Sequence, residues 1–363
     1  MKIEIAGHSG CKIELRSEGN KSVLRKYSSG ENYNQRLKSQ QEKQALFVEK
    51  YGIEHVSAPQ ILSDGEKDDL YYFEMPFLPS KSFVNYFEHA DNHGVKNFIT
   101  VIRNFFDVLI ENNSYEQVPL SKLTDKYYQV KRTCSQNYFL RENTMELFYH
   151  TDNIMDHLRN TMNHFNIPTG FCHGDLTLSN ILFGSNGNRI DLIDFLDSFI
   201  ESPLMDMVKL RQDTEYFWSF MLYKKPFDQT KLKIILTYID ESIDRYFRKF
   251  EFYNDHYQVF QLVNFLRILQ YVNNRDIEDF LKKTISKIIK NIDYELNYSS
   301  SGSFDQVTNE PVFGADYPTP NAAGGTAPEA ITGCRYAYVG HRGQSSHHRC
   351  DKLTEALDKT SPT

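Results

Sequence analysis

The sequence predicts an α+β fold with two lobes, a small antiparallel β-rich amino-terminal lobe and a larger, mainly helical carboxy-terminal lobe. Short segments in which apolar and polar residues alternate dominate up to about residue 76. Longer segments with apolar residues three and four apart dominate residues 77–298. The first pattern is typical of strands with one buried face, and the second is typical of helices with one buried face. A chain of 363 residues is long enough to form both lobes.

The amino-terminal lobe, residues 1–76, begins with three strand-like segments and ends with a fourth. A glycine-bearing turn at residues 6–11 separates the first two strands. A helix is expected between the third and fourth strands, because Leu37 and Leu46 fall on one apolar side. Proline ends the last strand, since it cannot donate to a sheet. The expected strands cover residues 2–5, 12–15, 22–27 and 71–77, and the expected helix covers residues 34–51.

The carboxy-terminal lobe, residues 77–298, is expected to be helical around one strand-loop-strand segment. Its helical segments are rich in aromatic and aliphatic residues, and the segment that starts at Val95 is apolar enough to be buried. The strand-loop-strand segment contains a hairpin turn at residues 184–188, a run rich in residues that tolerate positive φ. Helices are expected over residues 95–112, 144–165, 204–223, 229–252, 257–272 and 277–298.

The composition changes at Ser299, where small and polar residues replace the bulky aliphatic ones. We interpret residues 299–363 as a low-complexity, disordered tail, with at most a short helix over residues 353–357. A zinc site is the alternative interpretation of the cysteines and histidines in this tail. It is disfavoured, because Cys334 lacks the nearby cysteine that such a site needs. The ligands of that alternative would be Cys334, His347, His348 and Cys350.

Charge and hydropathy exclude several classes of protein. The net charge of −7 gives no indication of a basic surface for nucleic acid. No apolar run approaches the roughly 20 residues of a transmembrane helix, so no membrane span is expected. The chain starts with a strand-like segment, which predicts that there is no signal peptide. Five cysteines without paired spacing predict reduced thiols and a cytoplasmic location. The oligomeric state is left open.

The most informative segment runs from Phe171 to Leu182 and reads FCHGDLTLSNIL. It places Asp175 five residues before Asn180, and Asp194 follows after the expected hairpin. A carboxylate, an amide and a second carboxylate in this order form the polar set that phosphoryl transfer needs. Asp175 would orient an acceptor hydroxyl and take its proton, while Asn180 and Asp194 would hold Mg²⁺ on the phosphates of ATP. These residues therefore indicate a phosphotransferase.

A different interpretation treats Asp175 as a turn cap and Asn180 as an ordinary turn residue. A lone His-x-Asp would favour that alternative, but the added spacing of Asn180 and Asp194 favours the site. Asp191 is a second candidate metal ligand, which we expect instead to face solvent on its strand. His173 is expected to brace the loop rather than to act on a substrate.

The small lobe must supply positive charge and backbone donors to nucleotide phosphates. Arg25 and Lys26 lie on opposite faces of the third strand, because strand side chains alternate. Arg25 shares a face with the apolar Val23, so Arg25 is the predicted phosphate ligand and Glu42 of the following helix is its predicted partner. The alternative is that Arg25 and Glu42 are solvated surface residues. Backbone N–H groups of the first turn would add further donors, namely those of Gly7, Ser9 and Gly10.

With these residues assembled, the chain resembles the aminoglycoside phosphotransferase and choline kinase superfamily of small-molecule kinases. Residues 173–182 match the catalytic loop of that family, and Ile193-Asp194-Phe195 matches its metal-binding strand. Residues 203–207 resemble the segment in which a proline and an aspartate anchor the next helix. The resemblance covers residues 1–297 and is strongest over residues 171–207. It implies a bilobed protein-kinase-like fold, with ATP as co-substrate and Mg²⁺ as cofactor.

Residues 75–79 resemble the hinge between the lobes in this family. The resemblance implies that backbone groups of Pro76 and Leu78 contact adenine. The chain departs from the family in having Pro76 where an acidic residue is frequent and Arg25 where lysine is frequent. Nothing in the sequence separates ATP from GTP as the nucleotide.

The resemblance also implies transfer of the γ-phosphate to a hydroxyl of a small molecule, such as a sugar, an amino sugar, an amino alcohol or an aminoglycoside. Acidic and aromatic residues after the catalytic segment could hold a cationic amine or stack on a sugar ring. The alternative is that the aromatic residues belong to a helix core and the acidic ones to the surface. The candidate substrate-binding residues are Asp197, Asp213, Glu215 and Trp218.

Two other functions stay open at this stage. A protein kinase is disfavoured because Thr177 stands where such enzymes have lysine, and because the Asp-Phe-Gly and Ala-Pro-Glu segments are absent. A non-catalytic nucleotide-binding relative that acts through partners is disfavoured because nucleotide binding alone would not require Asp175.

Overall fold

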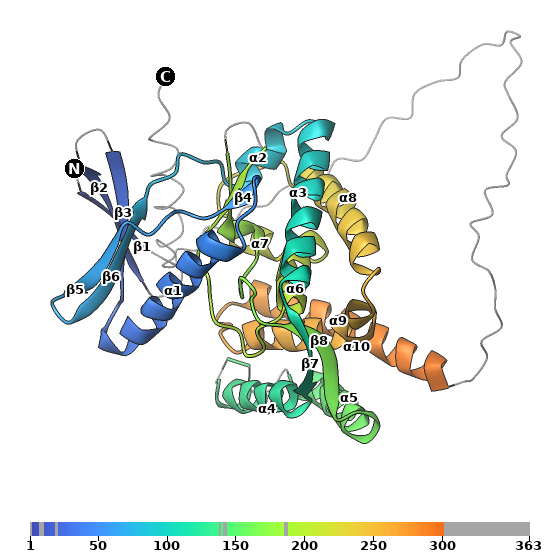
Figure 1. Cartoon of the computed structure of the whole chain (residues 1–363). Helices are drawn as coiled ribbons and strands as arrows, with labels where there is room; N and C mark the ends of the chain where they lie inside the picture. Colours follow the sequence, from blue (N-terminus) through green and yellow to red (C-terminus); the bar gives the residue numbers. More distant parts are fainter. Residues whose placement is uncertain are drawn as a thin grey trace, which may run out of the picture.

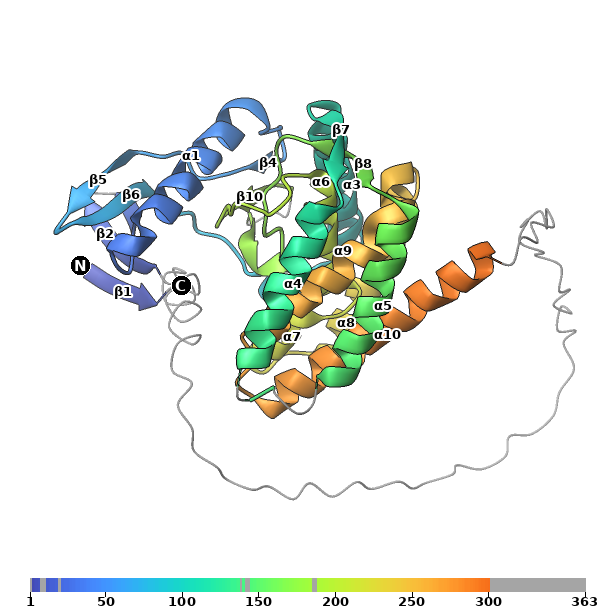
Figure 2. The ribbon, with the colours of Figure 1, turned by 90° about the horizontal axis from the view of Figure 1, so that it is seen from below.

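The computed structural model describes residues 2–6, 11–18, 21–137, 139–140, 144–184 and 188–300. These residues form a small lobe built on a sheet and one helix, and a larger lobe built mainly of helices (Figure 1, Figure 2). The bilobed α+β architecture that the sequence predicts is therefore confirmed.

The small lobe contains a five-stranded antiparallel sheet among the described residues, with the order β1-β2-β3-β6-β5. A short 3₁₀ turn, η1, leads into α1, which packs against β6. Leu37 of α1 and Phe73 of β6 meet in a small buried cluster. The elements are β1 (Lys2–Ala6), β2 (Lys12–Glu18), β3 (Lys21–Tyr27), η1 (Glu31–Tyr33), α1 (Asn34–Lys50), β5 (Ser63–Lys67) and β6 (Leu70–Pro76).

Phe47 of α1 joins the small lobe to the larger one. Its side chain is fully buried and belongs to the main core of the protein. Its ring lies 5.1 Å from that of Phe195 and 6.1 Å from that of Phe171, centroid to centroid. These two phenylalanines flank the segment that the sequence singles out as catalytic. The helix of the small lobe is therefore packed directly on the backbone that carries the candidate site.

A short three-stranded sheet holds that segment in place. β10 (Ile190–Leu192) pairs antiparallel with β9 (Ile181–Phe183) and parallel with β4 (Val56–Ser57). The β9–β10 pairing confirms the expected hairpin, whose turn residues 185–187 lie outside the described residues. Asn180 therefore lies just before β9, and Asp194 lies just after β10.

The helix α6 (Pro203–Thr214) lies in the larger lobe and contacts α3, α8 and α9 (Figure 1, Figure 2). Every residue of α6 is buried except Lys209. The remaining elements are α2 (Phe83–His89), α3 (Asn92–Glu111), β7 (Ser114–Pro119), α4 (Ser121–Gln136), α5 (Met145–Thr161), β8 (His164–Thr169), the 3₁₀ turn η2 (Leu178–Asn180), α7 (Trp218–Leu222), α8 (Gln229–Phe247), α9 (Glu251–Leu269) and α10 (Arg275–Ser300).

Several expected helix ends are wrong, each for a local reason. The helix expected over residues 204–223 is two helices, because Phe217 adopts a left-handed conformation with φ 57° between α6 and α7. The helix expected over residues 144–165 ends at Thr161, and the following residues form β8, which pairs with β7. The zinc alternative and the tail from residue 301 onward lie outside the described residues.

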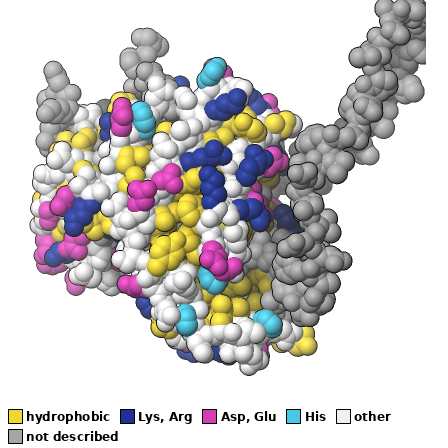
Figure 3. Space-filling view, turned by 45° about the vertical axis from the view of Figure 1, so that its right-hand side comes forward, with side chains coloured by type: hydrophobic (Ala, Val, Ile, Leu, Met, Phe, Trp, Pro, Cys, Tyr) yellow, Lys and Arg dark blue, Asp and Glu magenta, His cyan; other side chains and the backbone are white. Residues whose placement is uncertain are grey.

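The described surface carries charges of both signs. On the face drawn in Figure 3, Lys and Arg side chains gather near the centre, with acidic and hydrophobic side chains around them. Within the described part of the chain, no helix is both long and apolar enough to cross a membrane.

Candidate active site

The catalytic loop leaves β8, turns at Gly174 and reaches β9 through η2. Gly174 has a φ of 85°, a conformation that favours glycine. A Cβ atom at this position would lie 1.9 Å from the carbonyl oxygen of Leu196, so no larger residue fits without moving the backbone. The backbone N–H of Leu196 donates in turn to the carbonyl of His173 at 3.0 Å. Glycine therefore allows the segment after Asp194 to pass directly over the loop that carries Asp175.

Asp175 is held from two sides. The ammonium of Lys209 forms an ion pair with one carboxylate oxygen at 3.0 Å. The amide nitrogen of Asn180 donates to the other oxygen at 3.0 Å and to the backbone carbonyl of Asp175 at 2.8 Å. Burial raises the pKa of Asp175, but Lys209, His173 and Asn180 outweigh burial and hold that pKa below its ordinary value. The carboxylate is therefore ionised at neutral pH and fixed in orientation.

His173 braces the loop, as the sequence predicts. Its side chain is fully buried beside the ring of Phe195, with 4.4 Å between centroids. Nε2 lies 2.9 Å from the carbonyl oxygen of Ile193, and Nδ1 accepts from the backbone N–H of Asp175 at 3.2 Å. Burial lowers the pKa of His173 to about 4. The imidazole is therefore neutral near pH 7, and it links the two segments that carry the candidate residues.

Asp194 lies beside Asn180, because the backbone N–H of Ile193 donates to the carbonyl of Asn180 at 3.1 Å. Asp194 adopts a left-handed conformation with φ 61°, which is uncommon for a residue other than glycine and is concentrated at functional sites. The buried ammonium of Lys26 contacts its carboxylate at 2.7 Å and Gln40 of α1 at 2.9 Å. The structure therefore brings a cation of the small lobe to the metal-ligand candidates of the larger lobe.

The helix α6 holds both ends of the catalytic loop. Asp206 accepts hydrogen bonds from the backbone N–H groups of His173 at 2.6 Å and Gly174 at 2.8 Å. Asp213 accepts one from the N–H of Leu178 at 2.7 Å. Positions 206, 209 and 213 share one face of a helix, because they are three and four residues apart. One helix stripe therefore supplies Asp206 and Asp213 to the loop backbone and Lys209 to Asp175.

This arrangement corrects the expectation that Asp213 binds substrate. Asp213 is 1% exposed, and its second oxygen accepts from the backbone and hydroxyl of Ser219. Burial raises the pKa of Asp213 to about 6. Because both of its oxygens are used inside the protein, Asp213 positions the loop instead of meeting an acceptor.

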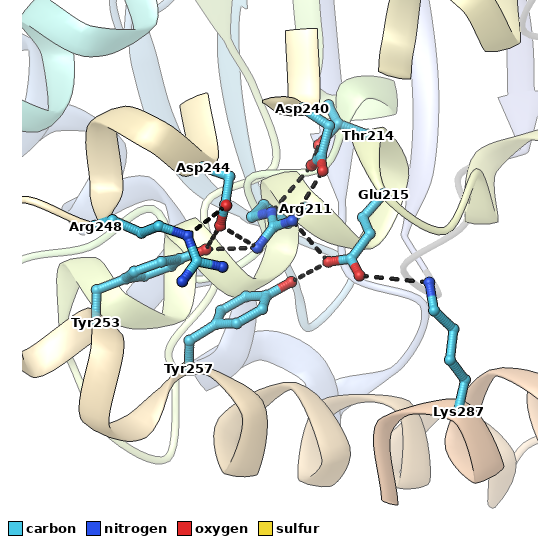
Figure 4. A network of polar contacts seen from close by, with 9 residues as sticks. All are labelled: Arg211, Thr214, Glu215, Asp240, Asp244, Arg248, Tyr253, Tyr257 and Lys287. Atoms are coloured by element: carbon cyan, nitrogen blue, oxygen red, sulfur yellow. Dashed lines mark hydrogen bonds and ion pairs between the residues drawn. The ribbon is translucent and has the colours of Figure 1, made fainter. Parts of the chain in front are cut away.

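Glu215 also belongs to the scaffold. It directly follows the last residue of α6 and lies in a network of polar contacts around Arg211 (Figure 4). Arg211 donates two hydrogen bonds to Asp240 and one to Asp244, both on α8. Glu215 accepts from Tyr257 of α9 at 2.8 Å and faces Lys287 of α10 at 3.7 Å. This network fixes α6 against the surrounding helices, which corrects the expectation that Glu215 binds substrate.

The structure also corrects the phosphate-ligand expectation for Arg25. Arg25 lies opposite Glu14 and Glu74 in the sheet, and residues opposite one another in a sheet share a face. Its guanidinium donates to Glu74 at 2.6 Å and does not reach the exposed Glu42. Lys26 points to the other face, toward α1 and Asp194. Lys26, rather than Arg25, is therefore the cation that the third strand supplies to the site.

The remaining described residues that the sequence analysis names as candidates do not lie together in one site. Asp191 is buried and pairs with Arg189 at 2.9 Å, which corrects the expectation that it faces solvent.

Asp197 is exposed, and Trp218 packs against Phe280 with 5.9 Å between ring centroids. Pro76 ends β6, and Leu78 follows in the segment between the lobes. Gly7, Ser9 and Gly10 lie outside the described residues.

Lys43 is a further residue that sequence reasoning missed. It lies one residue after Glu42 on α1, and its ammonium contacts Glu201 at 2.6 Å and the carbonyl of Leu196 at 2.7 Å. Gln40 and Lys43 are three residues apart and both are buried, so this helix face points inward. Applying the helix period to α1 and α6 could have identified Gln40, Lys43 and Lys209.

The geometry suits a divalent cation that is bound mainly by phosphate oxygens and water, with few ligands from the protein. No cluster of three or more His, Cys, Asp or Glu side chains is arranged to hold a metal in the described ranges. Asn180 turns its amide nitrogen toward Asp175, which leaves the amide oxygen available to a cation. An amide oxygen and one carboxylate, with phosphate oxygens and water, form a donor set that suits Mg²⁺.

Comparisons with known proteins identify the family and the fold. A family model described as the phosphotransferase enzyme family matches residues 6–223. The structure is similar to the apo form of a thermostable mutant of aminoglycoside phosphotransferase APH(4)-Ia, with a TM-score of 0.54, 10% identity, and coverage of 84% of this chain and 96% of that chain. It is also similar to a ternary complex of a thermostable mutant of that enzyme with AMP-PNP and hygromycin B, with a TM-score of 0.55, 10% identity, and coverage of 84% and 95%. A comparison with curated proteins gave no match.

The fold and the family match define a small-molecule phosphotransferase. The chain belongs to the phosphotransferase enzyme family, because the family model covers more than half of its length. At 10% identity the solved structures show only that the fold is shared.

Replacement of Asp206 by asparagine tests how the loop is held. An asparagine side chain at this position would offer one acceptor oxygen to two backbone donors, so we expect Asp206→Asn to lower the free energy of unfolding by about 1–3 kcal/mol at pH 5. Burial raises the pKa of Asp206 from 3.8 to about 7. Between these values the folded protein holds a proton that the unfolded chain releases, so this contribution is largest at low pH and is lost as pH rises through about 7.

The measurement is urea unfolding of wild type and Asp206→Asn at several pH values between about 4.5 and 7.5. The difference in unfolding free energy between the two proteins should shrink as pH rises. Subtracting the variant cancels the contribution of His173, whose lowered pKa gives the opposite pH dependence. A difference that grows with pH would contradict the assignment.

Proposed function

We propose that this protein transfers the γ-phosphate of ATP to a hydroxyl of a small molecule in the presence of Mg²⁺. The observation that carries the proposal is that hydrogen bonds link Asp175, Asn180 and the segment of Asp194, and that Lys26 of the small lobe contacts Asp194. Asn180 bonds Asp175 directly and is joined to the Asp194 segment through the backbone. Phosphoryl transfer depends mainly on positioning and electrostatics, and this rigid polar set supplies both.

Asp175 is the proposed catalytic base. Its carboxylate is ionised and oriented by Lys209 and Asn180, so it can accept a hydrogen bond from the acceptor hydroxyl and then its proton. A carboxylate with a lowered pKa is a weak base. Such a base suits this reaction, because the loose transition state asks more for orientation of the hydroxyl than for early proton removal.

Asn180 and Asp194 are the proposed Mg²⁺ ligands. Bound Mg²⁺ would neutralise charge on the β- and γ-phosphates during transfer. The side chain of Asp194 is 31% exposed, so its carboxylate is accessible to a ligand. The neighbouring Lys26 lies at hydrogen-bond distance from Asp194 and is proposed to bind phosphate oxygens when the nucleotide is present.

The remaining nucleotide contacts are proposed from the segment between the lobes. Backbone groups at Pro76 and Leu78 lie at the end of β6, where the chain passes from the sheet to α2. They are proposed to bind adenine, which needs only backbone partners. The turn containing Gly7, Ser9 and Gly10 is proposed to add backbone donors to the phosphates.

The first test is acceptor-stimulated release of ADP from ATP, across amino sugars, sugars, choline, ethanolamine and aminoglycosides. Wild type should release ADP with at least one acceptor in a Mg²⁺-dependent manner. Asp175→Asn should bind ATP as wild type does but lose turnover by about a hundredfold or more. Full turnover by Asp175→Asn would refute the assigned base. Phosphate transfer to protein and to no metabolite would favour a protein kinase instead.

A second test compares Lys26 with its neighbour Arg25. Lys26→Met should lower kcat/KM for ATP by about a hundredfold or more, the size expected when one preorganised cationic donor is removed. Arg25→Met removes a cation of the same strand from the opposite face, so its effect on kcat/KM for ATP should stay within about threefold of wild type. Steady-state kinetics at saturating acceptor provide the measurement. The reverse ranking would restore Arg25 as the phosphate ligand.

A further inference from the structure

Positive charge gathers beside Asp175 within the larger lobe. Lys209 on α6 forms an ion pair with the carboxylate at 3.0 Å. Arg267 lies on α9, which packs against α6, and it is close enough to interact electrostatically with Asp175. Two cations therefore face one carboxylate. The excess positive charge is carried by α6 and α9 of the larger lobe.

Arg267 has features of a ligand-binding residue. Its guanidinium is half-buried and lies 5.2 Å from the ring centroid of Phe199. In the described part of the chain, no hydrogen-bond or ion-pair partner is found for this guanidinium. Burial lowers the pKa of Arg267, while Asp175 and Tyr271 act in the opposite direction. An arginine held against an aromatic ring with its donors unused is preorganised to bind a planar anion.

Lys126 of α4 adds a third cation to this region. α4 packs against α9, and burial together with the nearby Arg267 lowers the pKa of Lys126. The ammonium of Lys126 donates to the neutral side chain of Gln129 at 3.0 Å. Neither Lys126 nor Arg267 has a carboxylate partner among the residues that the structure describes. Two like charges near each other, neither bonded to a carboxylate, favour the binding of an anion.

The acidic residues of this part of the protein are directed elsewhere. Asp206 and Asp213 bind the loop backbone, and Glu215 pairs with Arg211. Glu201 pairs with Lys43 of the small lobe. Asp197 is exposed to solvent, where its charge is screened. Of the residues that the sequence suggested as a cradle for a cationic amine, Asp213 and Glu215 are therefore already used inside the protein.

We propose that the acceptor carries an anionic group, a carboxylate or a phosphate ester, close to the hydroxyl that is phosphorylated. Arg267 binds this group and Lys126 adds to the attraction, while Lys209 remains on Asp175. This proposal rests on the proposed function and deepens it by naming the class of acceptor. An acceptor with an ammonium and no acidic group is disfavoured, because Lys209, Arg267 and Lys126 would repel it.

The chemistry of transfer is unchanged by this assignment. The bond between the γ-phosphorus and the oxygen that bridges to the β-phosphate breaks, and that oxygen leaves with ADP. A bond forms between the γ-phosphorus and the acceptor hydroxyl oxygen, whose proton passes to Asp175. The product carries the original anionic group and a new phosphate ester.

The test begins with products labelled from [γ-³²P]ATP in an extract of small metabolites, with Asp175→Asn as the blank. Labelled products that require Asp175 are separated by charge and identified by mass. The expected product contains a carboxylate or a second phosphate, and these two are distinguished by mass and by phosphatase treatment. A product with an ammonium and no second acidic group would overturn the inference and leave the proposed function intact. No product that requires Asp175 would count against the phosphotransferase itself.

Variants then test the residues, using the identified acceptor and a neutral analogue in which its anionic group is replaced by hydroxymethyl. Arg267→Gln should raise the KM for the anionic acceptor by about tenfold to a hundredfold, as expected for a lost hydrogen-bonded charge, and change kcat by less than about threefold. The KM for the neutral analogue should not change. Lys126→Gln should act in the same direction with a smaller effect.

Arg248→Gln is the matched control, because Arg248 is an exposed arginine at the end of α8 whose partner is Asp244. It should leave the KM for both compounds unchanged. Arg267→Glu should reverse the preference, lowering the KM for an analogue that carries an ammonium at the same place. An equal effect of Arg267→Gln on the anionic and neutral compounds would assign Arg267 a structural role and overturn the inference.

Discussion

Two buried carboxylates on α6 hold both ends of the catalytic loop, and the geometry of the site depends on them. Asp206 accepts from the N–H groups just before Asp175, and Asp213 accepts from the N–H of Leu178 just after it. Side-chain acceptors replace the sheet or helix partners that this loop backbone lacks. Buried hydrogen bonds of this kind are costly to leave unmade, so the loop has one favoured conformation.

Contacts between α6 and the surrounding helices keep Asp206 and Asp213 in place. Arg211 connects α6 to α8, while Glu215 connects it to α9 and α10. A similar arrangement holds the small lobe, because Lys43 of α1 reaches Glu201 and the carbonyl of Leu196 beside Gly174. The loop is therefore fixed by charged groups from both lobes. Positioning of this kind is what a phosphotransferase requires from its protein part.

The sequence predicts the local features of the site and misses those that depend on which face a residue occupies. The sequence can single out Asp175, Asn180 and Asp194 as candidates because their spacing along the chain is itself the signal. The apolar neighbour Val23 favours Arg25 over Lys26 as the phosphate ligand, but the cross-strand partners that decide the face of Arg25 include residues far away in sequence. A shift of one residue reverses the face of a strand side chain.

The same limit applies to the helical lobe. Asp213 and Glu215 look alike in sequence as acids after the catalytic segment, yet one binds the loop and the other binds Arg211. The break at Phe217 could not be predicted from the sequence. Aromatic residues rarely adopt a left-handed conformation, and tertiary packing holds this one there. The two lobes depend on composition and the β9–β10 hairpin depends on turn residues, so the sequence predicts both features correctly.

The most direct test of the central role of α6 is the kcat of Asp213→Asn beside that of Glu215→Gln, with ATP binding measured in both variants. The account predicts that Asp213→Asn lowers kcat by about tenfold to a hundredfold while it folds and binds ATP, because a lost acceptor loosens the loop near Asp175. Glu215→Gln, at the residue that follows the end of the same helix, should keep a kcat within about threefold of wild type. A folded Asp213→Asn variant with the kcat of wild type would contradict the account.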